Sequence, residues 1–269
     1  MNKTVRRVVP VLAIIGAAAI PVMTQQPKIG YDDTPLQPGT KWHVHDGTRP
    51  QPRVVTPGPA GGPVAAPSDA TVLVGPGADL TAWQMSEGGG AVTWPMKDGV
   101  LQSGKGMIQT KEQFSDVQLH VEFATPSEVK GDGQGRGNSG VFLAGVFEIQ
   151  VLDSYQNPTY PDGQASAMYG QFPPLVNASR GPGQWQTYDI IFTAPRFSAA
   201  GAVDKPAVVT VIHNGAVVHN ATPFWGPTAH KVIGKYAPSQ AKGPLRLQDH
   251  GNPVRFRNIW IRPLKTYDE

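Results

Sequence analysis

Cysteine is absent from the 269 residues of this sequence. Disulfide bonds, thiolate catalysis and cysteine-based metal sites are therefore excluded. Any exported form of the chain has to be stabilised by its hydrophobic core. With 39% hydrophobic residues, the chain is long enough to form one sizeable domain.

Clusters of basic residues are also missing, although the pI of 9.1 could suggest a protein that binds nucleic acid. Three of the 23 Lys and Arg residues lie within the first seven positions, and the others equal the 20 Asp and Glu residues in number. Without those three, the chain is close to neutral and has no basic patch that could bind phosphates. We therefore expect no nucleic-acid partner.

Long apolar runs are scarce, and the uncharged run from Val8 to Met23 follows Lys3, Arg6 and Arg7. A basic start before a short apolar stretch is typical of an export signal. The run is short for a bilayer span of about 20 residues. We expect a signal peptide at 1–24 and a protein in the periplasm or outside the cell. The alternative is a retained N-terminal anchor, and no other membrane contact is expected.

Residues 25–67 are rich in proline and glycine and poor in apolar side chains. A segment of this composition cannot bury enough surface to fold alone, so we expect an extended linker. The stretch "KWHVHDGTRP" at 41–50 is the exception. Its Trp42 could dock onto the globular part, or it could be an incidental aromatic residue.

Residues 68–266 consist of short alternating apolar runs such as "VQLHVEFA" and "VRFRNIWIRPL". Asp98-Gly99 and Asn214-Gly215 lie between such runs, and these dipeptides favour tight hairpins. No stretch keeps a helical apolar period over three turns. The pattern predicts one all-β domain of two antiparallel sheets packed face to face, which would offer a concave polar face as a binding groove.

The stretch "GVFEIQVLDSYQN", 145–157, alternates as a half-buried strand until Leu152 and Asp153 arrive in swapped order. A β-bulge near 151–152 would restore Asp153 to the polar face, and bulges often lie beside active sites. We therefore predict Glu148, Gln150 and Asp153 in one row. In the alternative, Asp153 begins a turn and Glu148 faces solvent.

A glycine-rich loop precedes this strand in "GDGQGRGNSGVFL", 131–143. It lacks the Gly-Lys-Ser/Thr ending of a phosphate loop and leads into a strand instead of a helix. Because the connection between the two strands is short, we expect Arg136 and Asn138 to lie across from Gln150 and Asp153. The alternative is a flexible loop that carries one charge.

Tyr169, Trp185 and Tyr188 could supply the aromatic surfaces that sugar rings need, although the last two could equally be core residues. Asp249 and His250 stand beside a glycine turn in "LQDHGNP". A histidine there could be a base, a metal ligand or a turn residue.

Three candidate metal ligands could gather from separate segments, namely Glu148, Asp153 and His250. The spacing of the histidines does not support a zinc site. A bound divalent cation therefore stays an open alternative, and no cofactor is certain.

Several stretches together resemble the bacterial 3-keto-disaccharide hydrolase family, which is described as 3-keto-α-glucoside 1,2-lyase / 3-keto-2-hydroxy-glucal hydratase. They cover roughly residues 70 to 264, and "KWHVHDGTRPQPRVVTPG" is similar to a lead-in of some members. The resemblance implies an antiparallel jelly-roll sandwich of the concanavalin A-like lectin/glucanase type. The stretches are "GRGNSGVFL", "FEIQVLDSY", "DGQASAMYGQFPPLVNASR", "PGQWQTYDIIFTAPRF", "PAVVTVIHNGAVVHN" and "GPLRLQDHGNPVRFRNIWIRPL".

A more distant similarity is to laminarinase-type glycoside hydrolases, which carry a bulged strand with Glu-x-Asp-x-x-Glu. The corresponding positions here are Glu148, Gln150 and Asp153. The amide in the middle puts ordinary two-carboxylate hydrolysis in doubt.

The resemblance implies cleavage of 3-keto-glycosides by β-elimination across C1–C2, followed by hydration of the 3-keto-2-hydroxy-glucal. Such chemistry needs a base near C2, a donor or cation at the C3 oxygen, and an acid at the leaving oxygen. We expect Glu148 to be the base, Arg136 with Asn138 or Gln150 to be the donors, and Asp153 or His250 to serve the leaving group and the water. A divalent cation is the alternative to Arg136.

Substrate contacts are also expected from Tyr169 and Asp249. The partner is an oxidised 3-keto sugar, which a separate sugar 3-dehydrogenase could supply. Two other functions stay open, a non-catalytic carbohydrate-binding module and an ordinary glycoside hydrolase.

Overall fold

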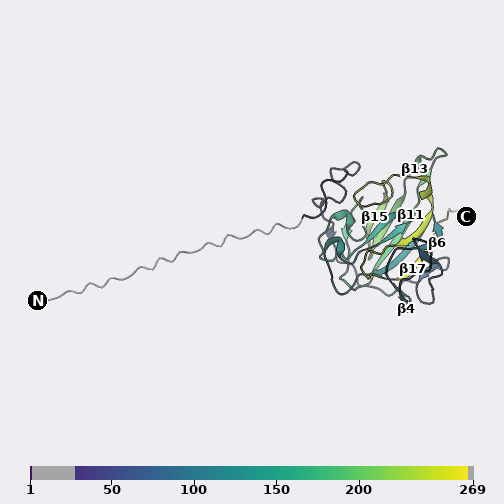
Figure 1. Ribbon diagram of the computed structural model, residues 1–269, viewed down its shortest axis with the longest axis horizontal. Coiled ribbons are helices and arrows are strands. Elements are labelled where there is room, and N and C mark those ends of the chain that lie inside the picture. The colour runs from purple at the N-terminus through teal and green to yellow at the C-terminus, as the bar shows by residue number, and fades with distance from the viewer. Residues whose placement is uncertain (2–27, 266–269) are drawn as a thin grey trace.

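The computed structural model describes residue 1 and residues 28–265, in which nearly all regular structure is β-strand (Figure 1). The expected signal peptide and the alternative anchor lie, apart from Met1, outside the described residues. Within the described part, no helix is long and apolar enough to cross a membrane. The helical segments found there are three short 3-10 helices: η1 (Gly133–Gly135), η2 (Pro161–Gly163) and η3 (Pro238–Ala241).

Two antiparallel sheets form a sandwich, which confirms the predicted all-β fold. The larger sheet has eight strands, and the smaller sheet has five in the order β3-β6-β16-β8-β9. Seven strands of the larger sheet follow one another in the order β15 (Ala216–Pro223), β14 (Val208–His213), β11 (Gln186–Thr193), β7 (Val117–Ala124), β17 (Arg255–Pro263), β5 (Val100–Gln102) and β4 (Met96–Lys97). The eighth strand, β2 (Thr71–Val74), also pairs with β17. The smaller sheet consists of β3 (Trp83–Met85), β6 (Ile108–Phe114), β16 (Gly243–Leu247), β8 (Ser139–Leu143) and β9 (Phe147–Val151).

The core lies between the sheets because alternate side chains of each strand point inward. On β7, Leu119, Val121 and Phe123 are fully buried. Across the interface, the ring of Phe147 on β9 lies 5.6 Å from that of Phe192 on β11, centroid to centroid. Because these side chains point inward, the alternate side chains of β8 and β9 lie on the outer face of the smaller sheet.

Both predicted hairpin turns are present. Asp98 and Gly99 join β4 to β5 with φ of 51° and 74°, and Asn214 and Gly215 join β14 to β15 with φ of 51° and 85°. Two successive residues with positive φ are what a two-residue hairpin loop requires. The remaining strands form two-stranded ribbons: β1 (Arg53–Val54) with β10 (Val176–Asn177), which is parallel, and β12 (Arg196–Phe197) with β13 (Val203–Lys205).

Residues 28–50, which we call the N-terminal arm, pack against the sandwich. Val44 and His45 are fully buried, and Gln37 is 1% exposed. This differs from the expected extended linker, because a few buried side chains anchor a segment whose composition is otherwise that of a tether. Docking of the stretch 41–50 does occur, but Val44 and His45 make it, whereas Trp42 is only half-buried. Beyond β1, residues 58–65 are exposed, as expected of a linker.

Candidate functional site

A cleft of about 490 Å³ lies over the outer face of β8 and β9. It brings together five of the residues expected at the site, Asn138, Glu148, Gln150, Tyr169 and His250. Sequence reasoning missed its other lining residues, which come from the arm, the loops and β8: Tyr31, Gln134, Phe142, Tyr160, Thr228, Ala229, His230 and Gln248.

Glu148 supplies a buried carboxyl to this cleft. Its strand places it on the outer face, yet the side chain is covered and the residue is only 5% exposed. Burial raises the pKa of Glu148 to about 8, because the charged form loses its hydration. Among the described residues that line the cleft, Glu148 is the sole carboxylate. The site therefore offers one proton acceptor poised near neutral pH.

Gln150 lies beside Glu148 on the same face of β9. With its amide oriented so that the nitrogen faces acceptors, that nitrogen lies 2.8 Å from Ser139 O and 3.1 Å from Glu148 Oε1. Gly140 pairs with Gln150 across the strands, and a Cβ at Gly140 would stand 2.3 Å from Glu148 Oε1. The Glu148 carboxyl thus occupies space that only a glycine leaves open.

Tyr169 is brought to Glu148 because the segment 166–168 pairs with the free edge of β9. The Gln150 N–H donates to Ala167 O at 3.0 Å, and the Tyr169 N–H donates to Glu148 O at 3.3 Å. The Tyr169 hydroxyl lies 3.1 Å from the Tyr160 hydroxyl. Burial raises the pKa of both phenols well above the usual value, so both stay protonated at neutral pH.

His230 closes this wall of the cleft. Its Nδ1 lies 3.1 Å from the Tyr169 hydroxyl, which links Tyr160, Tyr169 and His230 in one hydrogen-bonded row. The Thr228 N–H donates to Val146 O at 3.0 Å and holds the segment against the start of β9. Partial burial and nearby positive groups lower the pKa of His230. In the sequence, nothing sets this histidine apart from any other loop histidine.

Asn138 Oδ1 and Gln248 Oε1 are two buried acceptor oxygens that have no hydrogen-bond partner among the described residues. Both side chains line the cleft. Buried polar atoms are nearly always paired in proteins.

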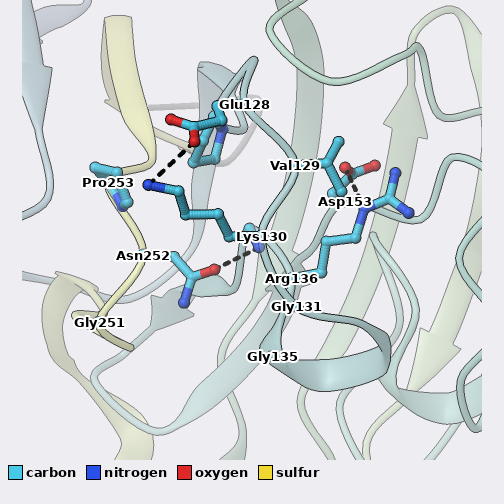
Figure 2. Close-up of a pocket in the computed structure, with 12 residues that line it drawn as sticks. Glu128, Val129, Lys130, Gly131, Gly135, Arg136, Asp153, Gly251, Asn252 and Pro253 are labelled. Carbon is cyan, nitrogen blue, oxygen red and sulfur yellow. Dashed lines mark hydrogen bonds and ion pairs between the residues drawn. The ribbon is translucent and has the colours of Figure 1, made fainter.

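Arg136 and Asp153 lie apart from Glu148, in a neighbouring hollow of about 430 Å³ (Figure 2). There the Arg136 Nε donates to Asp153 Oδ2 at 2.7 Å. The predicted row of Glu148, Gln150 and Asp153 is wrong, and so is the predicted bulge. β8 and β9 pair in regular register from Leu143 opposite Phe147 to Ser139 opposite Val151, where β9 ends. Asp153 therefore follows the strand and turns toward the glycine-rich loop.

Asp249 belongs to a turn rather than to the cleft. Its carboxylate accepts from the Gly106 and Gly251 N–H groups, each at 2.8 Å. Of the other aromatic candidates, Tyr188 is fully buried in the core, and Trp185 lies under the Arg257 guanidinium at 4.1 Å. Neither lines the cleft.

No group of three His, Asp or Glu side chains close enough to hold a metal ion occurs in the described part of the chain. The expected set of Glu148, Asp153 and His250 fails because Asp153 lies in the second hollow. Glu148 and His250 remain together at the cleft.

Comparison with known proteins identifies the family of the chain. Residues 69–262 match the model of the 3-keto-alpha-glucoside-1,2-lyase-like domain family. No curated protein sequence matches the chain. A crystal structure from Parabacteroides distasonis ATCC 8503, described as a "putative glycosyl hydrolase", is similar at 46% identity and a TM-score of 0.69, covering 80% of this chain and 93% of that one.

Two further structures from the same organism carry the same description and share the fold. One is 23% identical with a TM-score of 0.53 and covers 72% of this chain and 99% of its own. The other is 19% identical with a TM-score of 0.51 and covers 70% and 90%. The family match spans most of the chain and includes the strands that carry the cleft. The chain belongs to the 3-keto-alpha-glucoside-1,2-lyase-like domain family and is a carbohydrate-active enzyme that processes glycosides.

Proposed function

We propose that the protein cleaves 3-keto-glycosides by β-elimination and then hydrates the resulting 3-keto-2-hydroxy-glucal. The observation that carries this proposal is the single buried carboxyl of Glu148 in the cleft. Ordinary glycoside hydrolysis needs two carboxyl groups about 5–10 Å apart around the scissile bond. Elimination needs only one base, because the C3 ketone already acidifies the hydrogen at C2.

The reaction proceeds through an enolate. The base removes the proton from C2, the electron pair forms the enolate, and the C1–oxygen bond then breaks as the leaving oxygen takes a proton. Water adds at C1 of the unsaturated sugar, and C2 regains a proton. The net change is hydrolysis of the glycosidic bond without an oxocarbenium ion.

Glu148 acts as the base, since a pKa of about 8 matches proton transfer near neutral pH. Tyr169 donates to the C3 oxygen and stabilises the enolate, in place of Arg136. The leaving oxygen departs after removal of the C2 proton, which is the step that limits the rate, and takes its proton from His230 or His250, both of which line the cleft. Asn138 and Gln248, whose side chains line the cleft, contact sugar hydroxyl groups.

The 3-keto substrate has to be made by oxidation of a sugar hydroxyl at C3. We propose that a separate sugar 3-dehydrogenase supplies it, and that the protein works after export, in the periplasm or outside the cell. Secretion of the tagged chain, followed by N-terminal sequencing, would test the export signal.

The test of function is incubation with a 3-keto-glucoside and with its unoxidised parent in D₂O. We expect release of the aglycone from the keto form alone, with deuterium at C2 of the product, because the proton there exchanges during elimination. Glu148→Gln should lower kcat by about 10²- to 10⁴-fold, the usual contribution of a general base.

Glu112→Gln provides the matched control, because Glu112 is an exposed glutamate on β6 and does not line the cleft. It should keep wild-type kcat. Release from the unoxidised parent without deuterium at C2 would identify an ordinary glycoside hydrolase. Glycan binding with no release from either substrate would identify a binding module, and each result would overturn the proposal.

A further inference from the structure

The N-terminal arm contributes directly to the cleft, although it precedes the residues that match the family model. Tyr31 lines the cleft. Its N–H donates to His45 O at 2.9 Å, and the Lys231 Nζ lies 3.6 Å from the centroid of its ring. The arm is therefore fixed both to itself and to the segment that carries His230.

His45 and Asp162 form a buried pair behind the cleft. The pair is 0% and 1% exposed, and His45 Nδ1 lies 3.1 Å from Asp162 Oδ1. Asp162 Oδ2 also accepts from the His45 N–H at 2.9 Å and from Gln37 Nε2 at 2.8 Å. Three donors from the arm thus converge on one carboxylate of the sandwich domain.

The ring of His45 packs against all three members of the hydrogen-bonded row at the cleft. Its centroid lies 4.2 Å from that of Tyr160, 4.7 Å from Tyr169 and 5.1 Å from His230. A shift of His45 would therefore move the groups that contact the sugar in the proposed mechanism.

A residue that only filled the space between these rings would need neither the backbone conformation nor the buried ring nitrogen of His45. Its φ of 62° lies in the left-handed region, which is unfavourable for a residue other than glycine. Its Nε2 is buried and has no partner among the described residues, which also costs stability. Strained and polar residues that persist in a protein commonly serve its function.

We propose that the arm is part of the active site and that His45 is a positioning residue. Held by Asp162, it fixes Tyr160, Tyr169 and His230 around the substrate. This inference rests on the proposed function, in which Tyr169 and His230 act on the keto sugar.

The test compares His45→Gln with His43→Gln in the full chain. His43 lies two residues away, and its Nδ1 contacts Thr34 O within the arm rather than the cleft. We expect His45→Gln to lower kcat on a 3-keto-glucoside by about tenfold to a hundredfold, the effect of a small misplacement of reacting groups. KM and Tm should stay close to those of His43→Gln, which should keep wild-type kcat. Asp162→Asn provides a second variant with the same expected direction, should His45→Gln lower Tm.

A readout that does not need turnover is the pKa of His230, measured by NMR of its ring. The titratable groups around it are Tyr31, His45, Tyr169, Lys231 and His250. Losing His45 should raise the pKa of His230 toward 6.5, because the ring of His45 lies 5.1 Å from that of His230 and its charge lowers this pKa, whereas His43→Gln should leave it unchanged.

The outcomes separate the two proposals. No turnover by the wild type would overturn the proposed function, and the His230 titration would still show whether His45 controls the cleft. If the wild type turns over the substrate, and His45→Gln has the same kcat and the same His230 pKa as the wild type, the inference is overturned and the proposed function stands. Equal losses in His43→Gln and His45→Gln would also overturn it, since the effect would then be general to the arm.

Discussion

The carboxyl of Glu148 combines two properties that seldom occur together in a glutamate. It faces a cleft, and yet its residue is 5% exposed. Burial disfavours the charged form and raises its pKa to about 8. The same side chain can therefore take a proton from carbon and return one to carbon near neutral pH.

The pH dependence of kcat/KM follows from this pKa. Below pH 8 most of the enzyme carries a protonated Glu148 and lacks the base, so kcat/KM should fall by about tenfold for each pH unit. Above pH 8 it should level off. A pH–rate profile on a 3-keto-glucoside checks this, and a profile that is flat between pH 5 and 8 would rule out Glu148 as the base.

The β8–β9 hairpin is the element that positions this carboxyl. Its strands pair in regular register, and the short connection leaves Glu148 opposite Phe142 and diagonal to Gly140. The absence of a Cβ at Gly140 makes room for Glu148 Oε1. The geometry of the base thus depends on a glycine in the neighbouring strand.

Gly140→Ala should displace the Glu148 carboxyl, because the added Cβ would stand 2.3 Å from Oε1. We expect kcat/KM to fall by about tenfold or more, as for other small misplacements of catalytic groups. Gly135→Ala is the control, since a Cβ there meets no atom within 4 Å. Steady-state kinetics of both variants provide the measurement. Equal activity of the two would show that Glu148 tolerates the shift.

The strands and hairpins were easier to predict from the sequence than the residues at which the strands end. Alternation and the Asp98-Gly99 and Asn214-Gly215 turns predicted strands and hairpins, because side-chain period and positive φ are local properties. The swapped order at Leu152 and Asp153 was ambiguous. A bulged strand and a strand that stops give the same pattern, and only the partner strand decides between them.

The candidate site was predictable in part for the same reason. Glu148, Gln150 and Asn138 lie on or beside strands whose faces the pattern fixes. His230 and Tyr31 reach the cleft through loop and arm contacts that depend on the tertiary fold. The docking of the arm could not be predicted from its composition. Two buried residues, Val44 and His45, are too few to change the average hydrophobicity of a Pro/Gly-rich segment.

Across the whole molecule, a second cluster of charges lies on the other side of the core from the cleft, on the outer face of the larger sheet. His120 and Glu122 are buried in it, whereas Asp189 and Arg257 are partly exposed. His120 Nδ1 lies 2.6 Å from Asp189 Oδ1, and its Nε2 lies 3.6 Å from Glu122 Oε1. The Arg257 Nε donates to Glu122 Oε2 at 2.7 Å. These contacts join β7, β11 and β17.

The cluster predicts how stability changes with pH. Burial alone would lower the pKa of His120, but the interactions with Asp189 and Glu122 outweigh it and raise the pKa to about 9. A raised folded-state pKa gives stability that is complete below the unfolded value of about 6.5 and is lost as pH rises through 9.

Removing this histidine tests the prediction. His120→Gln should lower the free energy of unfolding by about 1–2 kcal/mol at pH 6, between the effects of breaking an exposed and a buried ion pair, because the Asp189 side chain is 44% exposed. The difference from the wild type should shrink between pH 6.5 and 9. Urea denaturation at several pH values measures it, and a difference that stays constant to pH 10 would show that His120 acts through packing alone.

The cleft draws on residues from Tyr31 to His250, and this span has a consequence for biogenesis. Contacts between residues so far apart in sequence form late, since long loops have to close before they can be made. A ribosome-bound chain that has not yet exposed its last strands would hold the arm and Glu148 but no working cleft. Catalytic competence should therefore appear only after the chain has been released as far as the end of β17, in one step with the closure of the sandwich.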